Sequence, residues 1–219
     1  MELDDGGGTL TLDPSKIVCL LRNYADHAKE LKNAVPTQPR FFLKPPSSLL
    51  PEGGSILIPG TSKELHHEVE LALVISDECS RVRPEEAMEH VLGYLVMLDI
   101  TARDIQDEAK SKGLPWAEAK GYDTFAPYCR RFARKEDIDW RGRRIHLSIN
   151  GNIRQDGNTS DMIFPVETIV SSVSQVMTLE EGDIVLTGTP AGVGPLRAND
   201  IIKAGIDGIG EGTFRVAQR

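Results

Sequence analysis

Short runs of β-branched and other apolar residues recur along most of the chain, and this pattern constrains the fold more than any other feature. Gly, Pro and Asn, which favour turns, lie between most of the runs. The runs cover residues 17–21, 41–44, 55–59, 68–75, 93–99, 144–150, 183–188 and 200–210. We therefore expect a mostly β protein with a few short helices, of the α+β class.

Helical periodicity is confined to a few segments. We expect helices around residues 23–32, around residues 84–90, after Asp99 and at residues 165–177. The last is the clearest, because Pro165 suits a first helical turn and apolar residues follow it at helical spacing. The pair Asn150-Gly151 predicts a two-residue hairpin turn, since both turn positions need positive φ.

The composition is that of one globular domain. The chain has 219 residues, of which 40% are hydrophobic, enough for a sizeable core. Residues 1–15 include three consecutive glycines and are expected to form a flexible or peripheral segment, whereas residues 16–219 contain no linker or repeat. We expect residues 16–219 to form a single catalytic domain.

The charge balance and the apolar runs exclude several classes of protein. There are 25 Lys and Arg against 33 Asp and Glu, a net charge of -8, which is the wrong sign for a nucleic-acid binder. No apolar run approaches the roughly 20 residues of a membrane helix, and no leader opens the chain. The three cysteines lie far apart and fit neither a disulfide framework nor a thiolate metal site. We expect a cytoplasmic protein with no nucleic-acid or membrane partner.

Two glutamates lie one residue apart where an apolar run begins. Glu68 and Glu70 share one face of an expected strand, with Cα atoms roughly 6.6 Å apart, and Asp99 ends a second apolar run. Carboxylates held that close to a core raise each other's pKa unless a cation lies between them. Three carboxylates without a thiolate predict a Mg²⁺ or Mn²⁺ site. The alternative is a solvated strand end, with Asp99 as a helix N-cap.

Other polar residues follow the acids. In a helix after Asp99, Arg103 and Gln106 would lie on one face, a cation and an amide suited to an anionic, carbonyl-bearing ligand. Arg103 could instead pair with Asp107. Lys44 and Lys120 lie next to apolar or sparsely charged segments, and either could also be a surface lysine.

Histidines offer a base but not an evident metal ligand. His27 and Glu30 have helical i, i+3 spacing, so the carboxylate can orient the imidazole for deprotonating water; a routine surface ion pair is the alternative. His66 and His67 are adjacent in an expected strand and face opposite ways, so neither is assigned to the metal. The Gly- and Pro-rich segment 187–195 lacks the features of a nucleotide-binding loop. It is either a rigid turn or a loop whose backbone N–H groups hold a carboxylate.

Together these segments resemble a known family. The chain contains RNYADHAKE, FFLKP, HHEVELALV, GYLVMLDITARDIQDEAKSKGLPWAEAKGYD, INGNIRQDG and LEEGDIVLTGTPAGVGP in this order. This set, from about Lys16 to Ile209, is similar to the fumarylacetoacetate hydrolase family. The similarity is greatest to its short single-domain branch, acylpyruvases that also act as oxaloacetate decarboxylases.

The resemblance implies a fold and a role for each matching residue. The fold is a mixed β-sandwich roll, usually a homodimer. The resemblance implies that Glu68, Glu70 and Asp99 bind Mg²⁺ or Mn²⁺, and that His27 and Glu30 form a water-activating dyad on a small lid helix. It also implies that substrate oxygens are contacted by Arg22, Arg103, Gln106, Lys120 and Thr189. Of these, Lys120 is counted among the catalytic residues.

Two departures from the family limit what the resemblance implies. Leu21 stands where members commonly have Gly before Arg-Asn-Tyr, so the backbone there approaches a ligand less freely. The separate N-terminal domain of larger relatives is absent from this chain, so their substrate range does not transfer with the motifs.

The expected activity is Mg²⁺-dependent hydrolysis of the C–C bond of acylpyruvates, which are 2,4-diketo acids, to pyruvate and a carboxylic acid. Oxaloacetate decarboxylation is the first alternative, because it shares the enolate-forming step and needs no water. Isomerisation or decarboxylation of a 2-hydroxydienoate from aromatic degradation, of the 2-hydroxyhepta-2,4-diene-1,7-dioate type, is another. A metal-bearing binding protein without catalysis is the alternative from a different class.

Overall fold

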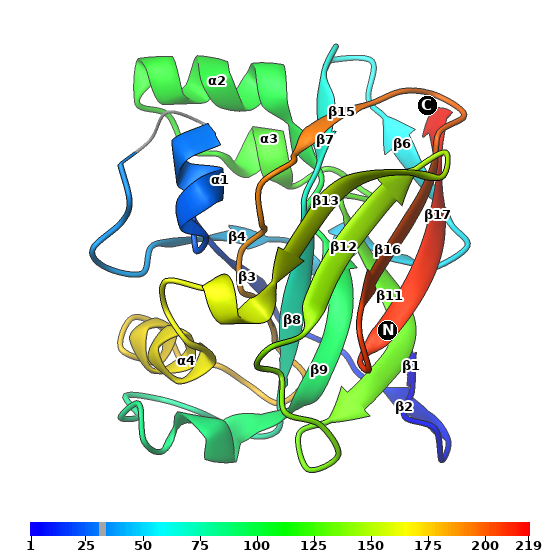
Figure 1. Ribbon diagram of the computed structural model, residues 1–219. Coiled ribbons are helices and arrows are strands. Elements are labelled where there is room, and N and C mark those ends of the chain that lie inside the picture. Colours follow the sequence, from blue (N-terminus) through cyan, green and yellow to red (C-terminus); the bar gives the residue numbers. More distant parts are fainter. Residues whose placement is uncertain (31–33) are drawn as a thin grey trace.

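Strands form most of the regular structure in the computed structural model, which describes residues 1–30 and 34–219 (Figure 1). Nine strands of the described residues form one mixed sheet, in the order β2-β1-β11-β9-β8-β14-β3-β4, with β5 beside β11. Their bounds are β1 Glu2–Asp4, β2 Thr9–Thr11, β3 Ile17–Leu20, β4 Phe41–Lys44, β5 Leu49–Pro51, β8 Val69–Ile75, β9 Val91–Leu98, β11 Ala126–Arg134 and β14 Ile184–Leu186.

Two smaller sheets complete the strands of the described residues. The five-stranded sheet has the order β13-β12-β16-β17-β6, with bounds β6 Ser55–Ile58, β12 Arg144–Ile149, β13 Asn152–Asn158, β16 Ile201–Ile206 and β17 Gly210–Gln218. The three-stranded sheet has the order β10-β7-β15, with bounds β7 Leu65–His67, β10 Thr101–Ala102 and β15 Gly194–Leu196. The expectation of a mostly β chain with short helices is confirmed.

The main core lies between the two larger sheets. Figure 1 shows the five-stranded sheet crossing in front of β8 and β9. Alternate residues of β8, Leu71 and Leu73, belong to the same buried cluster as Leu147 of β12 and Phe214 of β17. The β8 residues that alternate with Leu71 and Leu73 pack in a second cluster on the other side of the sheet, so β8 is buried on both faces.

Helices lie along one side of the sheets (Figure 1). Their bounds are α1 Ala25–Glu30, α2 Arg103–Lys112, α3 Ala117–Lys120 and α4 Val166–Ser174, with 3-10 turns at η1 Pro46–Ser48, η2 Ala87–His90 and η3 Thr159–Asp161. The helix expected at 165–177 is confirmed as α4, and the one expected after Asp99 as α2. The helix expected around 84–90 is only a 3-10 turn. Of the helix expected at 23–32, Ala25–Glu30 is observed as α1, and residues 31 and 32 lie outside the described residues.

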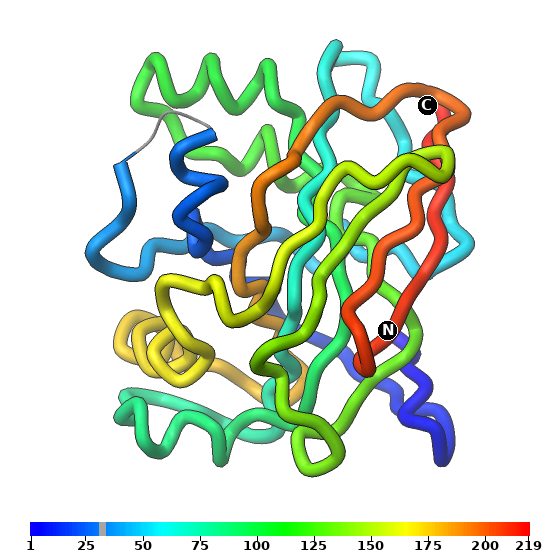
Figure 2. The backbone as a smooth tube through the Cα atoms, viewed as in Figure 1, coloured from blue at the N-terminus to red at the C-terminus, as the bar shows by residue number. Residues whose placement is uncertain are grey.

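The hairpin at Asn150-Gly151 is confirmed. It joins β12 to β13, with φ of 52° at Asn150 and 80° at Gly151. Near the N-terminus, β1 and β2 form a second hairpin at the edge of the nine-stranded sheet, where β1 runs parallel to β11. Figure 2 traces this hairpin and the last strand, β17, to the same side of the molecule.

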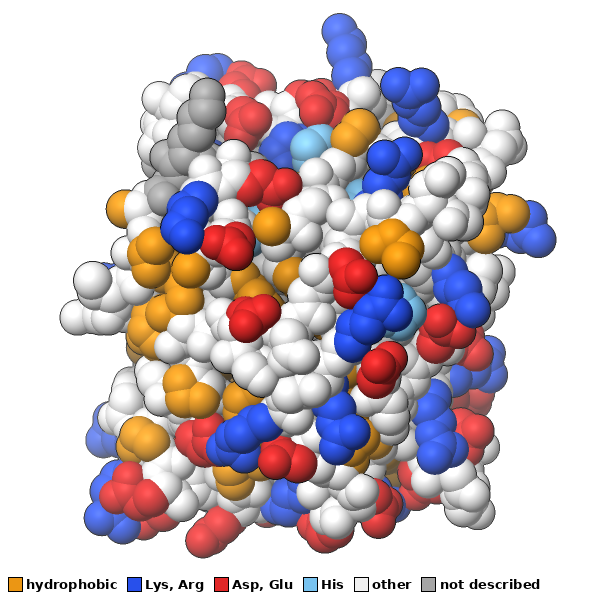
Figure 3. All heavy atoms as spheres, in the orientation of Figure 1, with side chains coloured by type: hydrophobic (Ala, Val, Ile, Leu, Met, Phe, Trp, Pro, Cys, Tyr) orange, Lys and Arg blue, Asp and Glu red, His pale blue; other side chains and the backbone are white. Residues whose placement is uncertain are grey.

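The surface carries charges of both signs. Acidic and basic side chains are interspersed over the face drawn in Figure 3. Within the described residues, no helix is both long enough and apolar enough to cross a membrane. Cys19, Cys79 and Cys129 are all buried and form no disulfide.

Candidate active site

The pairing of β8 with β9 brings the three acids together. Glu68 directly precedes β8 and Glu70 is its second residue, while Val69 between them pairs with Leu98 of β9. Asp99 follows Leu98, and its N–H donates to the Glu68 carbonyl at 2.8 Å. Because side chains alternate along a strand, both glutamates point away from the face that Val69 takes, toward Asp99. The expected shared face of Glu68 and Glu70 is thus observed.

The three carboxylates form a buried cluster. One oxygen from each of Glu68, Glu70 and Asp99 lies within 4.8 Å of the other two. The side chains are almost fully buried, with relative exposures of 6%, 1% and 1%. In the part of the chain that the structure describes, no other group of three His, Cys, Asp or Glu residues has this geometry. A solvated strand end, the alternative considered from the sequence, does not fit this burial.

Three cations surround two of the acids. Lys120, the last residue of α3, places Nζ 2.5 Å from Asp99 and 3.1 Å from Glu68. Lys44, at the end of β4, lies 2.8 Å from Asp99, and Arg103 lies 2.5 Å from Glu68. Both lysines are buried rather than on the surface. Burial lowers the pKa of Lys120, but the charges of Asp99 and Glu68 outweigh it, so the pKa is raised and the ammonium is kept.

The third acid lacks such a partner. No salt bridge to Glu70 occurs among the described residues, and its Oε2 accepts only the Gly188 N–H, at 2.6 Å. Burial raises the pKa of Glu70 well above its usual value, and the charges of Asp99 and Glu68 raise it further. Burial also acts on Glu68, but Lys120 and Arg103 bring its pKa well below the usual value. Within the described residues, Glu70 thus has no protein cation beside it, and the all-oxygen set of three carboxylates suits Mg²⁺ or Mn²⁺.

Polar side chains of α2 lie next to the acids. Arg103 Nη1 donates to Gln106 Oε1 at 2.5 Å, so the two residues lie on one face of the helix as expected. Asp107 does not pair with Arg103 but with Lys110, at 3.3 Å. The site-facing side of α2 thus presents a guanidinium and an amide.

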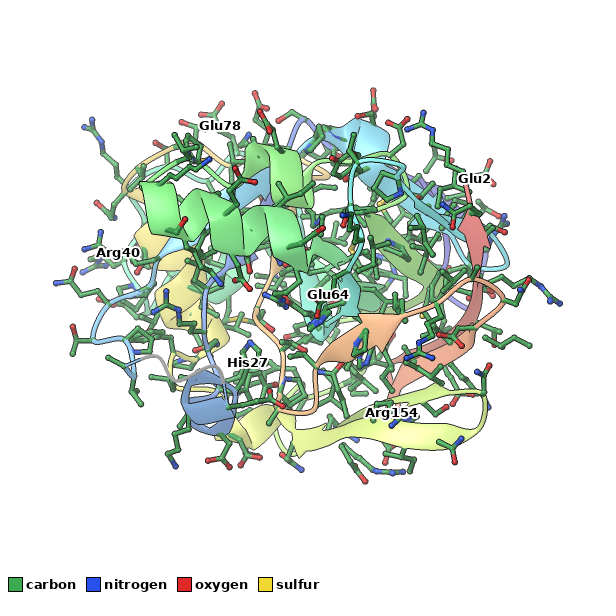
Figure 4. All side chains as sticks on the ribbon, turned by 90° about the horizontal axis from the view of Figure 1, so that it is seen from above. Glu2, His27, Arg40, Glu64, Glu78 and Arg154 are labelled. Carbon is green, nitrogen blue, oxygen red and sulfur yellow. The ribbon has the colours of Figure 1, made fainter. Side chains whose placement is uncertain are left out.

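The expected base pair lies on α1. His27 Nδ1 is 3.2 Å from Glu30 Oε2, and His27 is buried. The Glu30 carboxylate also accepts the Gly192 N–H, at 3.0 and 3.3 Å. In the view from above, α1 with His27 lies beside the pale orange strip of the 187–195 loop (Figure 4). The pair is therefore not a free surface ion pair but part of the packing between α1 and this loop.

The 187–195 loop holds carboxylates of the protein itself. Its backbone N–H groups at Gly188 and Gly192 donate to Glu70 and Glu30, one from each end of the site. Gly188 has a φ of 96°, and a Cβ there would lie 2.7 Å from the Cβ of Asn23. Glycine is required at this position because both the φ and the contact exclude a side chain.

The residues predicted from the sequence converge on one pocket. All but one of the predicted site residues line this pocket: Arg22, His27, Glu68, Glu70, Asp99, Arg103, Gln106, Lys120 and Thr189. The exception is Glu30, which bonds to His27. Lys44, to which the sequence alone assigned no role, contacts Asp99. The sequence feature that pointed to Lys44 is its place at the end of an apolar strand. Phe42 and Trp116 form an apolar wall with ring centroids 5.8 Å apart, and no pattern in the sequence indicated it.

Leu21, the departure from the family pattern, also lines this pocket. Its N–H donates to the Arg40 carbonyl at 2.7 Å, which fixes the backbone. Arg22, next in the chain, has a φ of 56°, in the left-handed region that few non-glycine residues adopt. The two histidines left out of the metal site bond elsewhere: His66 contacts Glu64 and Arg103, and His67 contacts Gln155.

Comparisons with known proteins agree with this site. Residues 16–217 match the family model described as fumarylacetoacetate (FAA) hydrolase C-terminal. The chain is 50% identical over 201 residues to the mitochondrial oxaloacetate tautomerase FAHD1 of Bos taurus, covering 91% of this chain and 90% of that one.

Solved structures share the whole fold. A fumarylpyruvate hydrolase from Pseudomonas aeruginosa, in complex with Mn²⁺ and pyruvate, has a TM-score of 0.94 at 33% identity, covering 100% of this chain and 96% of that chain. A 2-hydroxyhepta-2,4-diene-1,7-dioate isomerase from Mycobacterium marinum has a TM-score of 0.84 at 38% identity, covering 95% and 76%. The mixed β-sandwich roll expected from the resemblance is therefore confirmed. Because the family model matches residues 16–217 of its 219 residues, the chain belongs to the fumarylacetoacetate hydrolase family of enzymes.

Proposed function

We propose that this enzyme hydrolyses the C–C bond of acylpyruvates, giving pyruvate and a carboxylic acid, with Mg²⁺ or Mn²⁺ held by Glu68, Glu70 and Asp99. The observation that carries the proposal is that the acid cluster and the His27–Glu30 pair meet at one pocket. Support for the metal and the product class comes from the Pseudomonas aeruginosa neighbour, whose structure contains Mn²⁺ and pyruvate. The alternative of a binding protein without catalysis is set aside, because the chain belongs to a family of enzymes.

Cleavage requires an electron sink next to the bond that breaks. A divalent ion bound by the three acids would polarise the 2-oxo group and favour the enolate of pyruvate as leaving group. Lys120 stays protonated between Asp99 and Glu68, so its ammonium offsets negative charge developing on the substrate. We assign the side chains of Arg22, Arg103 and Gln106 to binding and orienting the substrate oxygens. Thr189 would contribute its backbone N–H, because its hydroxyl donates to the Val69 carbonyl.

Hydrolysis also requires an activated water. Because Glu30 bonds to Nδ1 of His27, Nε2 is the ring nitrogen available as a base. His27 takes a proton from water as the water oxygen bonds to the distal carbonyl carbon. The C–C bond then breaks, its electron pair passes to the enolate, and protonation at carbon yields pyruvate.

Oxaloacetate chemistry is the second candidate, and a relative favours it. The Bos taurus protein that is 50% identical is named an oxaloacetate tautomerase. Decarboxylation of oxaloacetate releases CO₂ and forms the same pyruvate enolate, whereas keto–enol exchange passes through the enolate of oxaloacetate itself. Neither reaction needs attack by water. His27 would then only move a proton at carbon. Isomerisation of a 2-hydroxydienoate is a third candidate, supported by the name of the Mycobacterium marinum neighbour.

The test is turnover by metal-stripped protein, with and without added Mg²⁺ or Mn²⁺. Pyruvate release is measured from acetylpyruvate and from oxaloacetate, and loss of the oxaloacetate enol is followed by its absorbance. Metal-dependent pyruvate release from acetylpyruvate is the expected result. Enol loss without pyruvate release from either substrate would replace hydrolysis by tautomerisation as the function.

For assembly and location we keep the expectations drawn from the sequence. We propose a homodimer in the cytoplasm, with residues 16–219 as one catalytic domain and no nucleic-acid or membrane partner. The name of the Bos taurus relative assigns that protein to mitochondria, so fractionation of the source cells tests the location. Sedimentation in solution tests the homodimer.

A further inference from the structure

Gln155, on β13, connects the strand that carries the metal acids to the 187–195 loop. Its side chain is fully buried. Oε1 accepts the Val69 N–H at 3.1 Å and lies 3.0 Å from His67 Nδ1. Nε2 donates to Thr189 Oγ1 at 2.7 Å and to the Pro190 carbonyl at 2.9 Å. One amide thus makes four hydrogen bonds, two to the segment 67–69 around Glu68 and two to residues 189 and 190 of the loop.

The partners fix the orientation of this amide. A backbone N–H at Val69 can only donate and a carbonyl at Pro190 can only accept, so Oε1 must face Val69 and Nε2 must face Pro190. His67 must then donate from Nδ1. The network therefore has one arrangement of its protons, a condition for a rigid polar core.

The Thr189 hydroxyl is fixed by the same logic. It accepts from Gln155 Nε2 and donates its own proton to the Val69 carbonyl at 2.8 Å. Val69 is therefore bound through both its N–H and its carbonyl, and it is the residue between Glu68 and Glu70. The loop is held against the strand at the point where the metal acids begin.

Both ends of the active site depend on the position of this loop. Gly188, next to Thr189, donates to Glu70, and Gly192, two residues after Pro190, donates to Glu30. We propose that Gln155 is a positioning residue: it fixes the 188–192 segment so that Gly188 orients Glu70 and Gly192 orients Glu30. Gln155 does not line the pocket and acts through these partners. The inference rests on the proposed metal site and water-activating pair.

The first test compares Gln155→Met with Ser174→Ala. Met keeps length and volume but makes none of the four bonds. Ser174 of α4 is a matched control, because it is also buried and bonds two backbone groups, the Ser171 carbonyl and the Val82 N–H, away from the pocket. For Gln155→Met we expect about a tenfold weaker Mn²⁺ affinity in the absence of substrate and about a 100-fold lower kcat on acetylpyruvate. KM should change much less, and Ser174→Ala should stay near wild type in Mn²⁺ affinity and kcat.

Gln155→Glu separates the two halves of the network. An ionised Glu keeps the acceptors for Val69 and His67 but cannot donate to Thr189 or Pro190. Its kcat should therefore fall as far as that of Gln155→Met, and it decides the test if the Met variant does not fold. A folded Gln155 variant whose Mn²⁺ affinity and kcat match those of Ser174→Ala would overturn the positioning role. If wild type itself turns over no 2-oxo acid, the proposed function fails and Mn²⁺ affinity alone decides the role of Gln155.

Discussion

The two ends of the pocket are built in different ways. The metal end uses residues of paired strands, and its acids are held by β8, β9 and three buried cations. The base end uses α1, a six-residue helix, and the side chain of Glu30 is 33% exposed. The metal end is thus part of the core, whereas the base end depends on a few bonds between α1 and a loop. Substitutions at the two ends should differ accordingly.

Asp99→Ala should have the largest effect. It removes a metal ligand, so metal-dependent turnover should fall at least about 10³-fold, the effect of losing several kcal/mol of charge stabilisation. It also leaves Lys44 and Lys120 buried with fewer counter-charges, which should cost roughly 3–5 kcal/mol of stability. Turnover, Mn²⁺ binding and denaturant unfolding measure these effects. Full activity in a folded Asp99→Ala protein would contradict the metal assignment.

His27→Ala should affect reactions rather than the fold. Hydrolysis of acetylpyruvate should fall by about 100-fold, the usual contribution of a positioned general base. Oxaloacetate decarboxylation should fall much less, since no water is activated, and Mn²⁺ affinity should be unchanged. Rates on both substrates with one preparation give the comparison. Equal losses on the two substrates would rule out a role specific to water.

The pH dependence of metal binding should reveal the raised pKa of Glu70. Its raised pKa means that the folded, metal-free protein holds a proton that the unfolded chain releases at lower pH. This contribution to stability is therefore present at low pH and is lost as pH rises toward the raised pKa. Mn²⁺ must displace that proton, so its affinity should increase with pH by up to about tenfold per unit.

The rise in melting temperature on adding Mn²⁺, measured between pH 5 and 8, checks this. It should grow with pH in wild type. Glu70→Gln provides the control, because its side chain cannot titrate, and its smaller rise should change less with pH. A rise independent of pH in wild type would show that Glu70 does not compete with the metal.

Glu30→Gln should have the smallest effect. The amide keeps an acceptor for the Gly192 N–H but loses the charge beside His27. Loss of one charged hydrogen bond, roughly 1.5 kcal/mol, corresponds to about a tenfold slower hydrolysis. Mn²⁺ affinity and melting temperature should stay at wild-type values. A loss of hydrolysis rate as large as that of His27→Ala would show that Glu30 does more than orient His27.

Local patterns in the sequence predicted much of the fold. The helical spacing after Pro165 and the Asn150-Gly151 turn lead to α4 and the β12–β13 hairpin, because each depends on neighbouring residues alone. Two long strands, β11 and β17, were missed. β11 contains an exposed Arg130-Arg131 pair where its register shifts between Tyr128 and Phe132, so its apolar alternation is broken.

Other features depended on context. The segment around 84–90 contains helix-forming residues, yet it forms only a short 3-10 turn before entering β9. Packing against its neighbours decided this, since helix propensity is a weak prior that tertiary contacts override.

By itself, the sequence determined the direction of the acids: Glu68 and Glu70 must share a face because a strand alternates, and His27 and Glu30 must meet because a helix turns every 3.6 residues. Only the tertiary structure decided which other residues join them. Lys44 and Lys120 are 76 positions apart in the chain, and Gln155 is 86 positions from Val69. Contacts between residues so far apart in the chain depend on sheet register and loop packing, which no local sequence pattern predicts.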